Sequence, residues 1–582
     1  MQFRQAIITV DGQTHSLTPG KSNSFDSFFA DVQANPIWGE HIQEEGMQYM
    51  VFLHPKQDVV VQRLEIQFDI SLSVVGRFFA NGFQSWSESR WVSPADQVPR
   101  LRSIGQKYYG KEGDERILDI PRGKGRLHSW SYTVLRESPE KCTLLGSLNE
   151  RTGFTLFQYD HSNGVLTVRK DLENLHLSHS FPALDVAVFK GNEENVYAAW
   201  FQMRGKNDQS APRTVAKGWT NDPRLPLTDA VLQENLDAFA EMLHHGNAPS
   251  NVPSANYFLL GDGWQTSTGN WLSVQAALSP DLGKWVGKIK EKDLVPAIWL
   301  APFVAVATSD LVKKHPDWLL KDTKNKPIRA GWNRHWGGWV YALDFYHSGV
   351  QSWLAGVFHV LSEKWGFEQF HLDYLYAACL APPPGKTRGQ VMHDALLFLK
   401  ELIGKKRLVA AAVPLGTAME LADICHLGRS EVPVWEERLS AWLRRRERPG
   451  ALAALHNVLH YGRWQAIGID PGPCYLGSHH KKLTPFQQQT ILIVNVLLGN
   501  MFYTSDALKN WTTEEMTEYT EAMALSDSRV LSVSEMEANL YAILFEHRGD
   551  RYTAYCNLNG QKRRIPLMEL EAYETIVLGN TD

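Results

Sequence analysis

Residues 367–374 read Phe-Glu-Gln-Phe-His-Leu-Asp-Tyr, a short apolar run with a lone acid, Asp373, near its end. Such a run predicts a buried strand that delivers a carboxylate to the edge of a sheet. In a barrel of alternating strands and helices, the C-terminal ends of the strands carry the chemistry. Asp373 is therefore a candidate nucleophile, metal ligand or structural acid.

Seven further apolar runs of strand length lie on either side of this one. The predicted strands cover 215–219, 257–262, 296–301, 367–373, 408–413, 423–428, 464–470 and 500–506. Helical periodicity occupies stretches between and beside them, including 227–246, 281–293, 348–366, 389–404 and 484–500. Eight strand–helix alternations over roughly 300 residues predict a (β/α)8 barrel. A doubly wound sheet is the alternative, but the segment contains no phosphate-binding glycine fingerprint.

The chain on both sides of the predicted barrel is rich in strand-like runs. Before a polar linker at 207–212, alternating and β-branched runs separated by turn residues predict a large antiparallel sandwich. After about residue 510 the same pattern returns and predicts a small C-terminal sandwich. The expected fold is multidomain, α/β plus all-β. An N-terminal β-sandwich (1–205) and a C-terminal β-sandwich (509–582) flank a central (β/α)8 TIM barrel (206–508).

The composition favours a small-molecule partner. A formal net charge of −5 argues against a nucleic acid or a membrane surface as the main partner. The chain has 20 Trp, 19 Tyr and 25 Phe, which supply flat apolar surfaces of the kind on which sugar rings stack. Core packing of large residues is the alternative explanation for most of them.

The cysteine spacing and the N-terminal segment are used to predict the cell compartment. The five cysteines lie far apart, are odd in number and have no metal-binding spacing, so reduced thiols are expected. The first residues show no signal-peptide pattern, and no apolar run is long enough to span a membrane. A cytoplasmic protein without a cofactor is expected.

Polar and aromatic side chains collect at the ends of the predicted strands. They are Trp219, Asp262, Trp264, Trp299, His371, Asp373, His426, Ser430, Glu431, Asp470 and Asp506. Acids at strand ends often cap the next helix, but acids and tryptophans around one barrel mouth favour a sugar site. Glycosidases need two carboxyl groups flanking the scissile bond. His371 and Asp373 share one side of a strand and could bind a metal, but no second pair has matching spacing, so no metal is expected.

Several blocks resemble glycoside hydrolase family 36, which contains bacterial α-galactosidases (melibiases) and plant raffinose synthases. The blocks occupy 257–272, 296–303, 315–322, 338–344, 367–378 and 426–435, in the order and spacing of that family. The segment NGFQSW (81–86) resembles the loop that the family's sandwich domain extends into the active site. The resemblance covers almost the whole chain and implies the family's fold and ancestry.

The resemblance implies a retaining double displacement, nominally on an α-galactoside. Asp373 matches the nucleophile after the fourth strand, and Asp262 matches one of two acids that bind sugar hydroxyls. Four tryptophans match or neighbour positions that wall the sugar pocket: Trp86, Trp219, Trp264 and Trp332. A small oligosaccharide or glycoside is the implied substrate. Relatives are often oligomeric, so a homo-oligomer is compatible with the resemblance.

The chain departs from the family inside the pocket. Gly261 replaces one sugar-binding acid, His371 replaces a Lys, and His426 replaces an Arg. Ser430 stands at the position of the acid/base Asp, with Glu431 next to it. A serine hydroxyl cannot protonate a leaving group at neutral pH, and loss of general acid catalysis costs about 10²- to 10⁴-fold. Glu431 is the candidate replacement.

Three functions are open at this point. The first is hydrolysis of an α-galactoside through Asp373 and Glu431. The second keeps the mechanism but acts on another α-glycoside, including an anionic one because acids are lost at 261 and 430, or transfers the glycosyl group. The third is a catalytically weak sugar-binding homologue that lacks the usual acid.

Overall fold

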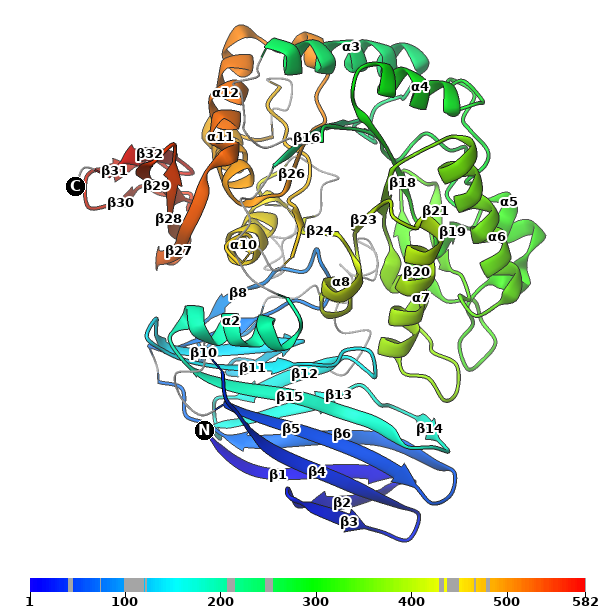
Figure 1. Ribbon diagram of the computed structural model, residues 1–582, viewed down its shortest axis with the longest axis vertical. Helices are drawn as coiled ribbons and strands as arrows, with labels where there is room; N and C mark the ends of the chain where they lie inside the picture. The colour runs from blue at the N-terminus through cyan, green and yellow to red at the C-terminus, as the bar shows by residue number, and fades with distance from the viewer. Residues whose placement is uncertain are drawn as a thin grey trace.

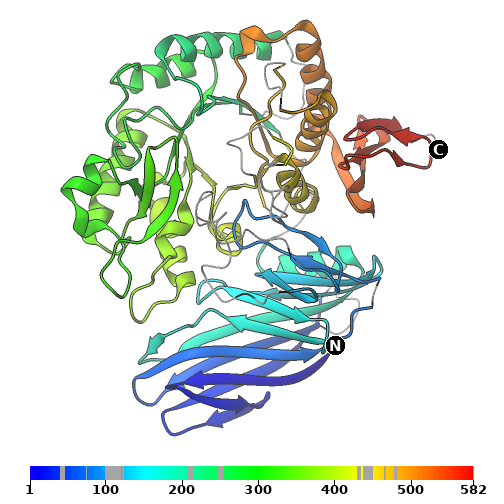
Figure 2. The ribbon, with the colours of Figure 1, turned by 180° about the vertical axis from the view of Figure 1, so that it is seen from behind.

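The computed structural model describes residues 1–39, 46–73, 75–98, 120, 123–206, 215–245, 255–428, 434–436, 450–464, 467–477 and 482–580. Three parts are visible in Figure 1: a β-sandwich, a barrel ringed by helices, and a small β-rich part at the C-terminus. The reverse view keeps the same arrangement, with the barrel in contact with both β-rich parts (Figure 2).

The N-terminal sandwich consists of two antiparallel sheets. One has the order β2-β1-β6-β13-β12-β9, with β14 beside β6. Its strands are β1 (Gln2–Val10), β2 (Gln13–Leu17), β6 (Val59–Asp69), β9 (Arg126–Trp130), β12 (Thr155–Asp160), β13 (Val165–Lys170) and β14 (Leu175–Leu177). In β1, Ala6, Ile8 and Val10 are buried at every second position, which is the alternation of a strand with one face in the core.

The second sheet of the sandwich has the order β3-β4-β5-β15-β11-β10-β7-β8. Its strands are β3 (Lys21–Ser24), β4 (Phe28–Ile37), β5 (Gly46–Pro55), β7 (Arg77–Ala80), β8 (Arg90–Val92), β10 (Tyr132–Ser138), β11 (Lys141–Ser147) and β15 (Phe181–Gly191). Helix α2 (Glu193–Met203) follows, and Asn192 caps its N-terminus by accepting from the Asn195 N–H at 2.8 Å.

The barrel strands are parallel and follow one another in chain order. They are β16 (Ala216–Thr220), β17 (Tyr257–Leu260), β18 (Val295–Leu300), β22 (Gln369–Leu372), β23 (Arg407–Ala410), β24 (Ile424–His426), β25 (Ile469–Asp470) and β26 (Met501–Thr504). The first strand pairs with the last, and Asn500 N–H donates to Ile469 O at 2.8 Å where the barrel closes. Each of the eight predicted strands is confirmed within the described residues, and so is the predicted (β/α)8 class.

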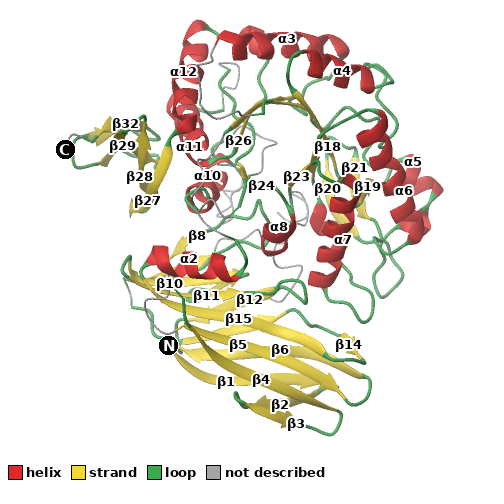
Figure 3. Ribbon diagram, in the orientation of Figure 1, coloured by secondary structure: helices red, strands yellow, loops and turns green. Residues whose placement is uncertain are grey.

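A helix follows each barrel strand and covers the outside of the barrel (Figure 3). The helices are α3 (Asp229–His245), α4 (Gly283–Glu291), α6 (Ser348–His359), α7 (Arg388–Ile403), α8 (Leu415–Leu421), α10 (Ala451–Tyr461), α11 (Pro485–Leu498) and α12 (Thr513–Met523). Short helical turns are η2 (Pro316–Trp318), η3 (Val360–Lys364), η4 (Leu375–Cys379), η5 (Leu508–Asn510) and η6 (Ala524–Asp527).

The barrel interior is a packed core. Strands β17, β22 and β26 are buried along their whole length, as expected for parallel strands covered on both faces. Tyr503 crosses the interior and accepts a hydrogen bond of 2.7 Å from Gln369 Nε2. A Cβ at position 218 would lie 2.3 Å from the Tyr503 ring, so only glycine fits at Gly218.

A small antiparallel sheet is inserted between the third and fourth barrel strands. It has the order β19-β21-β20 and contains β19 (Val304–Val306), β20 (Arg329–Asn333) and β21 (Gly338–Ala342), with α5 (Asp310–Lys314) between its strands. The Tyr376 hydroxyl, just after the fourth strand, donates to Ala330 O at 2.7 Å. This contact fixes the insertion against the mouth of the barrel, and the sequence patterns did not predict it.

The C-terminal part is antiparallel. It contains β27 (Arg529–Glu537), β28 (Leu540–His547), β29 (Asp550–Asn557) and β32 (Thr575–Gly579), with a separate pair β30 (Arg563–Arg564) and β31 (Glu569–Leu570). It contacts the barrel at α11, where Thr490 Oγ1 donates to Tyr573 O at 2.8 Å. The domain boundaries given above stay a prediction.

The segment 81–89 joins the sandwich to the barrel. Ser85 N–H donates to Val413 O at 2.9 Å, and Leu415 N–H donates to Phe83 O at 3.1 Å. Ser89 N–H donates to Asn457 Oδ1 at 2.7 Å. The segment is thereby held at the turn after β23 and at helix α10.

All five cysteines are buried and free, as their spacing predicts. In the described part of the chain, no helix combines the length and the apolar character needed to cross a membrane.

Candidate active site

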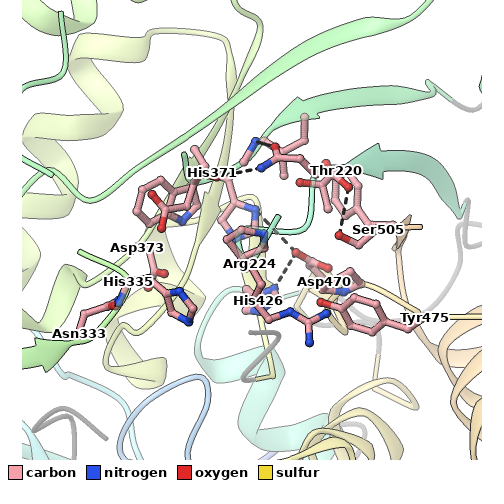
Figure 4. Close-up of a pocket in the computed structure, with 18 residues that line it drawn as sticks. Thr220, Arg224, Asn333, His335, His371, Asp373, His426, Asp470, Tyr475 and Ser505 are labelled. Atoms are coloured by element: carbon pink, nitrogen blue, oxygen red, sulfur yellow. Dashed lines mark hydrogen bonds and ion pairs between the residues drawn. The ribbon is translucent and has the colours of Figure 1, made fainter. Parts of the chain in front are cut away.

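A cavity of about 100 Å³ opens at the C-terminal ends of the barrel strands (Figure 4). Its described lining consists of Thr220, Asn221, Pro223, Arg224, Leu259, Gly261, Asp262, Trp299, Asn333, His335, His371, Asp373, His426, Asp470, Pro473, Tyr475, Tyr503 and Ser505. Strand ends supply most of these residues, and the inserted sheet supplies Asn333 and His335. This is the end of a (β/α)8 barrel at which active sites form.

Asp373 stands directly after β22 and faces the cavity, partly exposed. Its backbone N–H continues the sheet by donating to Leu300 O at 2.9 Å. Its Oδ1 accepts from the Tyr374 backbone N–H at 2.7 Å. Tyr374 has a φ of +53°, a left-handed conformation that is uncommon for a non-glycine residue. This turn ends the strand and orients the Asp373 carboxylate.

Asp262 stands two residues after β17 and is held by two donors. Its Oδ1 accepts from Gln265 Nε2 at 2.7 Å, and its Oδ2 accepts from Trp336 Nε1 at 2.6 Å. The Trp336 ring lies between those of Trp299 and Tyr374, with centroid distances of 5.9 Å and 5.0 Å. An aromatic row therefore runs from Trp299 through Trp336, the partner of Asp262, to Tyr374, the residue after Asp373.

Asn221 occupies the space beside Gly261. Its Oδ1 accepts from the Gly261 N–H at 2.7 Å, and its Nδ2 donates to Asp262 O at 2.8 Å. A Cβ at position 261 would lie 2.8 Å from Thr220 Oγ1 and 3.1 Å from Asn221 Oδ1. The carboxylate that the family pattern has here is thus absent, and its place is closed by neighbouring side chains.

His371, His426 and Asp470 form a buried cluster on one side of the cavity. His426 Nδ1 lies 2.8 Å from Asp470 Oδ2, and His371 Nδ1 lies 4.0 Å from the same oxygen. Both rings are directed toward this carboxylate in Figure 4. Asp470 Oδ1 accepts from the Gly472 N–H at 3.0 Å, which fixes the carboxylate.

The three groups of this cluster titrate differently. Burial, reinforced by the neighbouring His426, lowers the pKa of His371 to about 4. Burial also disfavours the charged forms of His426 and Asp470, but their mutual attraction outweighs it. The pKa of His426 is therefore raised and that of Asp470 is lowered. His371 is therefore neutral at neutral pH, whereas the shifts of His426 and Asp470 both favour the charged form of each group.

Arg224 lines the cavity in a pair with Asp222. Arg224 Nε donates to Asp222 Oδ1 at 2.8 Å, and its Nη2 contacts the other carboxylate oxygen. The guanidinium lies 5.6 Å from the centre of the Tyr475 ring, which also lines the cavity. The charge of Arg224 is thereby matched within the wall.

Several residues proposed from sequence line this cavity: Asp262, Trp299, His371, Asp373 and His426. Four tryptophans are not among the described lining residues. The Trp219 and Trp264 rings are buried and donate to Asp506 O and Trp299 O, and Trp86 donates to Gln84. Trp332 lies on β20 beside Asn333. Ser430 and Glu431 lie outside the described residues. The roles proposed for all of these residues stay predictions.

Sequence reasoning did not select Arg224, Asn333, His335, Trp336 or Tyr475. Four of these line the cavity, and Trp336 binds Asp262. The run GWNRHWGGW (331–339) contains Asn333, His335 and Trp336. An asparagine, a histidine and several tryptophans within nine residues are a sequence signal that could have pointed to these three.

Comparison with known proteins adds to this geometry. No protein-family model matches the chain. A bifunctional α-galactosidase/sucrose kinase of Mediterraneibacter gnavus is 28% identical over 79 residues, which is 12% of this chain and only 8% of that protein. An α-galactosidase of Thermus thermophilus, solved with p-nitrophenyl α-D-galactopyranoside, is 22% identical with a TM-score of 0.66, covering 94% of this chain and 98% of its own.

A second solved structure carries the family designation. The family 36 α-galactosidase AgaA of Geobacillus stearothermophilus is 11% identical with a TM-score of 0.62, covering 99% of this chain and 87% of its own. The chain has the family 36 α-galactosidase fold. This likeness confirms the family 36 resemblance in sequence at the level of the fold, over nearly the whole chain.

Proposed function

We propose that the chain is a retaining α-glycoside hydrolase, nominally an α-galactosidase, with Asp373 as its nucleophile. The observation that carries the proposal is the Asp373 carboxylate, which faces the cavity from the end of the fourth barrel strand. The fold is shared with α-galactosidases, and the Thermus enzyme was solved with stachyose. The substrate proposed here is accordingly a small oligosaccharide or glycoside.

In the first step an Asp373 oxygen attacks the anomeric carbon, and the bond from that carbon to the leaving-group oxygen breaks. The product is a glycosyl ester of Asp373, which water hydrolyses in the second step. The Tyr374 N–H that binds Oδ1 holds the carboxylate in place for this attack. Because the turn carrying Asp373 is fixed by backbone contacts, little reorganisation is needed.

Glu431 is the proposed acid and base. It follows β24, the strand whose last residue, His426, lines the cavity, so the chain beyond that strand starts at the cavity wall. Ser430 cannot supply a proton at neutral pH. Retention requires the two carboxyl groups to lie about 5–5.5 Å apart.

A different sugar at the same site is the second candidate, and Gly261 favours it. Position 261 has no room for the second sugar-binding carboxylate, because Thr220 and Asn221 fill the space. The hydroxyl pattern recognised there must therefore differ from that of relatives with two acids.

We favour a neutral sugar over an anionic one. Among the described lining residues, Arg224 is paired with Asp222 and His426 with Asp470. These cations are thus already matched by carboxylates. Comparing neutral and anionic aryl α-glycosides tests this point, and a clear preference for the anionic one contradicts it.

The deciding experiment uses p-nitrophenyl α-galactoside, whose good leaving group needs no acid in the first step. Wild type should turn it over, and Asp373→Ala should lose at least about 10³-fold in kcat/KM. Azide should restore part of the loss by attacking in place of the carboxylate. Sugar binding without turnover by wild type would favour the sugar-binding homologue instead. Transfer to an added acceptor sugar would identify a transglycosylase.

A further inference from the structure

Three buried polar side chains converge from three barrel strands. His371 on β22, His426 on β24 and Asp470 on β25 are 7%, 6% and 0% exposed. One potential ligand atom from each lies within 4.8 Å of the other two. Two imidazoles and one carboxylate form a donor set suited to a divalent transition metal.

The nitrogen of His371 that faces Asp470 points to a missing partner. His371 Nδ1 is buried and has no hydrogen-bond partner. Its distance of 4.0 Å to Asp470 Oδ2 is too long for a hydrogen bond. Buried polar atoms are rarely left unpaired, so such an atom in a cavity wall indicates a ligand or an ion.

The surroundings of the other two groups resemble the outer shell of a metal site. Asp470 Oδ1 is held by the Gly472 N–H at 3.0 Å, which leaves Oδ2 to face both imidazoles. The backbone of Gly428, two residues after His426, also acts to raise the pKa of that imidazole. Metal-binding histidines and carboxylates are usually oriented by such second contacts.

The separations also suit a metal. Ligand atoms about 2.0–2.1 Å from a tetrahedral Zn²⁺ lie about 3.3 Å from one another. The two separations to Asp470 Oδ2, 2.8 Å and 4.0 Å, bracket that value, and no pair among the three ligand atoms is more than 4.8 Å apart, so small movements of the rings would bring all three to a cation. The three residues also line the cavity, which leaves a coordination position open toward a bound molecule.

We propose that His371, His426 and Asp470 form a binding site for one divalent transition-metal cation, of which Zn²⁺ fits the donor set best. The cation replaces the proton shared between His426 and Asp470 and gives His371 Nδ1 a partner. A sugar hydroxyl can then coordinate from the cavity. The site does not rest on the proposed glycosidase function, and it revises the expectation that the chain binds no metal.

The test measures metal binding without substrate. Full-length protein is dialysed against a chelator, then titrated with Zn²⁺ by calorimetry and with Co²⁺ by visible absorption. Wild type should bind one equivalent of metal. With Co²⁺ it should give the intense visible absorption bands of a four- or five-coordinate ion. His371→Ala breaks no hydrogen bond at Nδ1, so it should fold normally. It should weaken binding beyond the roughly 10- to 100-fold typical of outer-shell changes.

A matched control and a second variant make the result decisive. His335→Ala removes another cavity-lining imidazole outside the cluster and should leave binding unchanged. Asp470→Asn keeps the side-chain shape and should lose the cation. Thermal melts confirm that each variant is folded. No uptake by wild type, or equal uptake by wild type and His371→Ala, would overturn the proposal.

Discussion

The indole N–H of Trp336 donates a hydrogen bond of 2.6 Å to Oδ2 of Asp262. Trp336 lies in the turn between β20 and β21 of the sheet inserted after the third barrel strand, and Asp262 follows the second strand. The contact therefore ties a carboxylate proposed to bind sugar to an element outside the barrel. Removing it should release the carboxylate while leaving the barrel strands untouched.

Trp336→Phe tests this role. A hydrogen bond to a charged group is worth about 1.5–3 kcal/mol, so KM for an aryl α-glycoside should rise about 10- to 100-fold. The fall in kcat should be smaller, because Asp373 is not touched. Trp339→Phe, on the neighbouring strand and stacked by Arg329, is the matched control and should change KM little. Equal KM values for Trp336→Phe and wild type would contradict the role.

Position 261 should tolerate no side chain. Gly261→Ala places a Cβ 2.8 Å from Thr220 Oγ1, so it should lower the free energy of unfolding by about 1–3 kcal/mol. Thr220→Ala in the same chain removes the nearest atom and should recover most of the loss. Thermal and denaturant unfolding of the two variants measure both effects. If Gly261→Ala is as stable as wild type, the space is not closed.

Asp171 and Arg388 form a buried ion pair between the sandwich and helix α7, with Arg388 Nη1 2.6 Å from Asp171 Oδ1. Burial raises the pKa of Asp171 to about 6, although Arg388 opposes the shift. An unfolded Asp titrates near pH ~3.9, so between there and the folded pKa only the folded chain keeps the proton.

The proton held by folded Asp171 therefore adds to the free energy of unfolding. This contribution is fully present below about pH 4, and about 1–3 kcal/mol of it is lost as the pH rises to about 6. Urea unfolding at several pH values across this window measures how the free energy of unfolding changes with pH. Asp171→Asn should lack the decrease that Asp171 contributes in wild type. Identical slopes in both proteins would mean that the carboxyl is ionised throughout.

The proposed acid is tested by changing the leaving group. Glu431→Ala should reduce turnover of an alkyl or sugar-linked α-glycoside by about 10²- to 10⁴-fold, because a poor leaving group needs a proton. The same variant should affect p-nitrophenyl α-galactoside much less in the first step. Ser430→Ala is the control and should behave like wild type. Should Glu431→Ala match wild type on both substrates, Glu431 is not the acid.

The barrel was predictable because each parallel strand is a continuous apolar run, and Asp262 and Asp373 were predictable because they stand just after such runs. Asn333 and His335, which line the cavity, and Trp336, which binds Asp262, were missed because they belong to an insertion whose own strands lack that pattern. For Trp219 and Trp264 the family resemblance implied positions at or beside the pocket wall, and in the structure both rings are buried with their N–H groups donating to backbone carbonyls. Their role in sugar binding stays a prediction.

The filled space beside Gly261 determines the order in which substitutions at this part of the pocket can be made. A single substitution from glycine to an acid would meet Thr220 and Asn221 before it could gain any new contact. Shortening Thr220 would remove the nearest contact, whereas changing Asn221 would also remove its two hydrogen bonds to Gly261 and Asp262. A carboxylate at position 261 would therefore require at least two substitutions, one at Gly261 and one at a neighbouring side chain that fills the space.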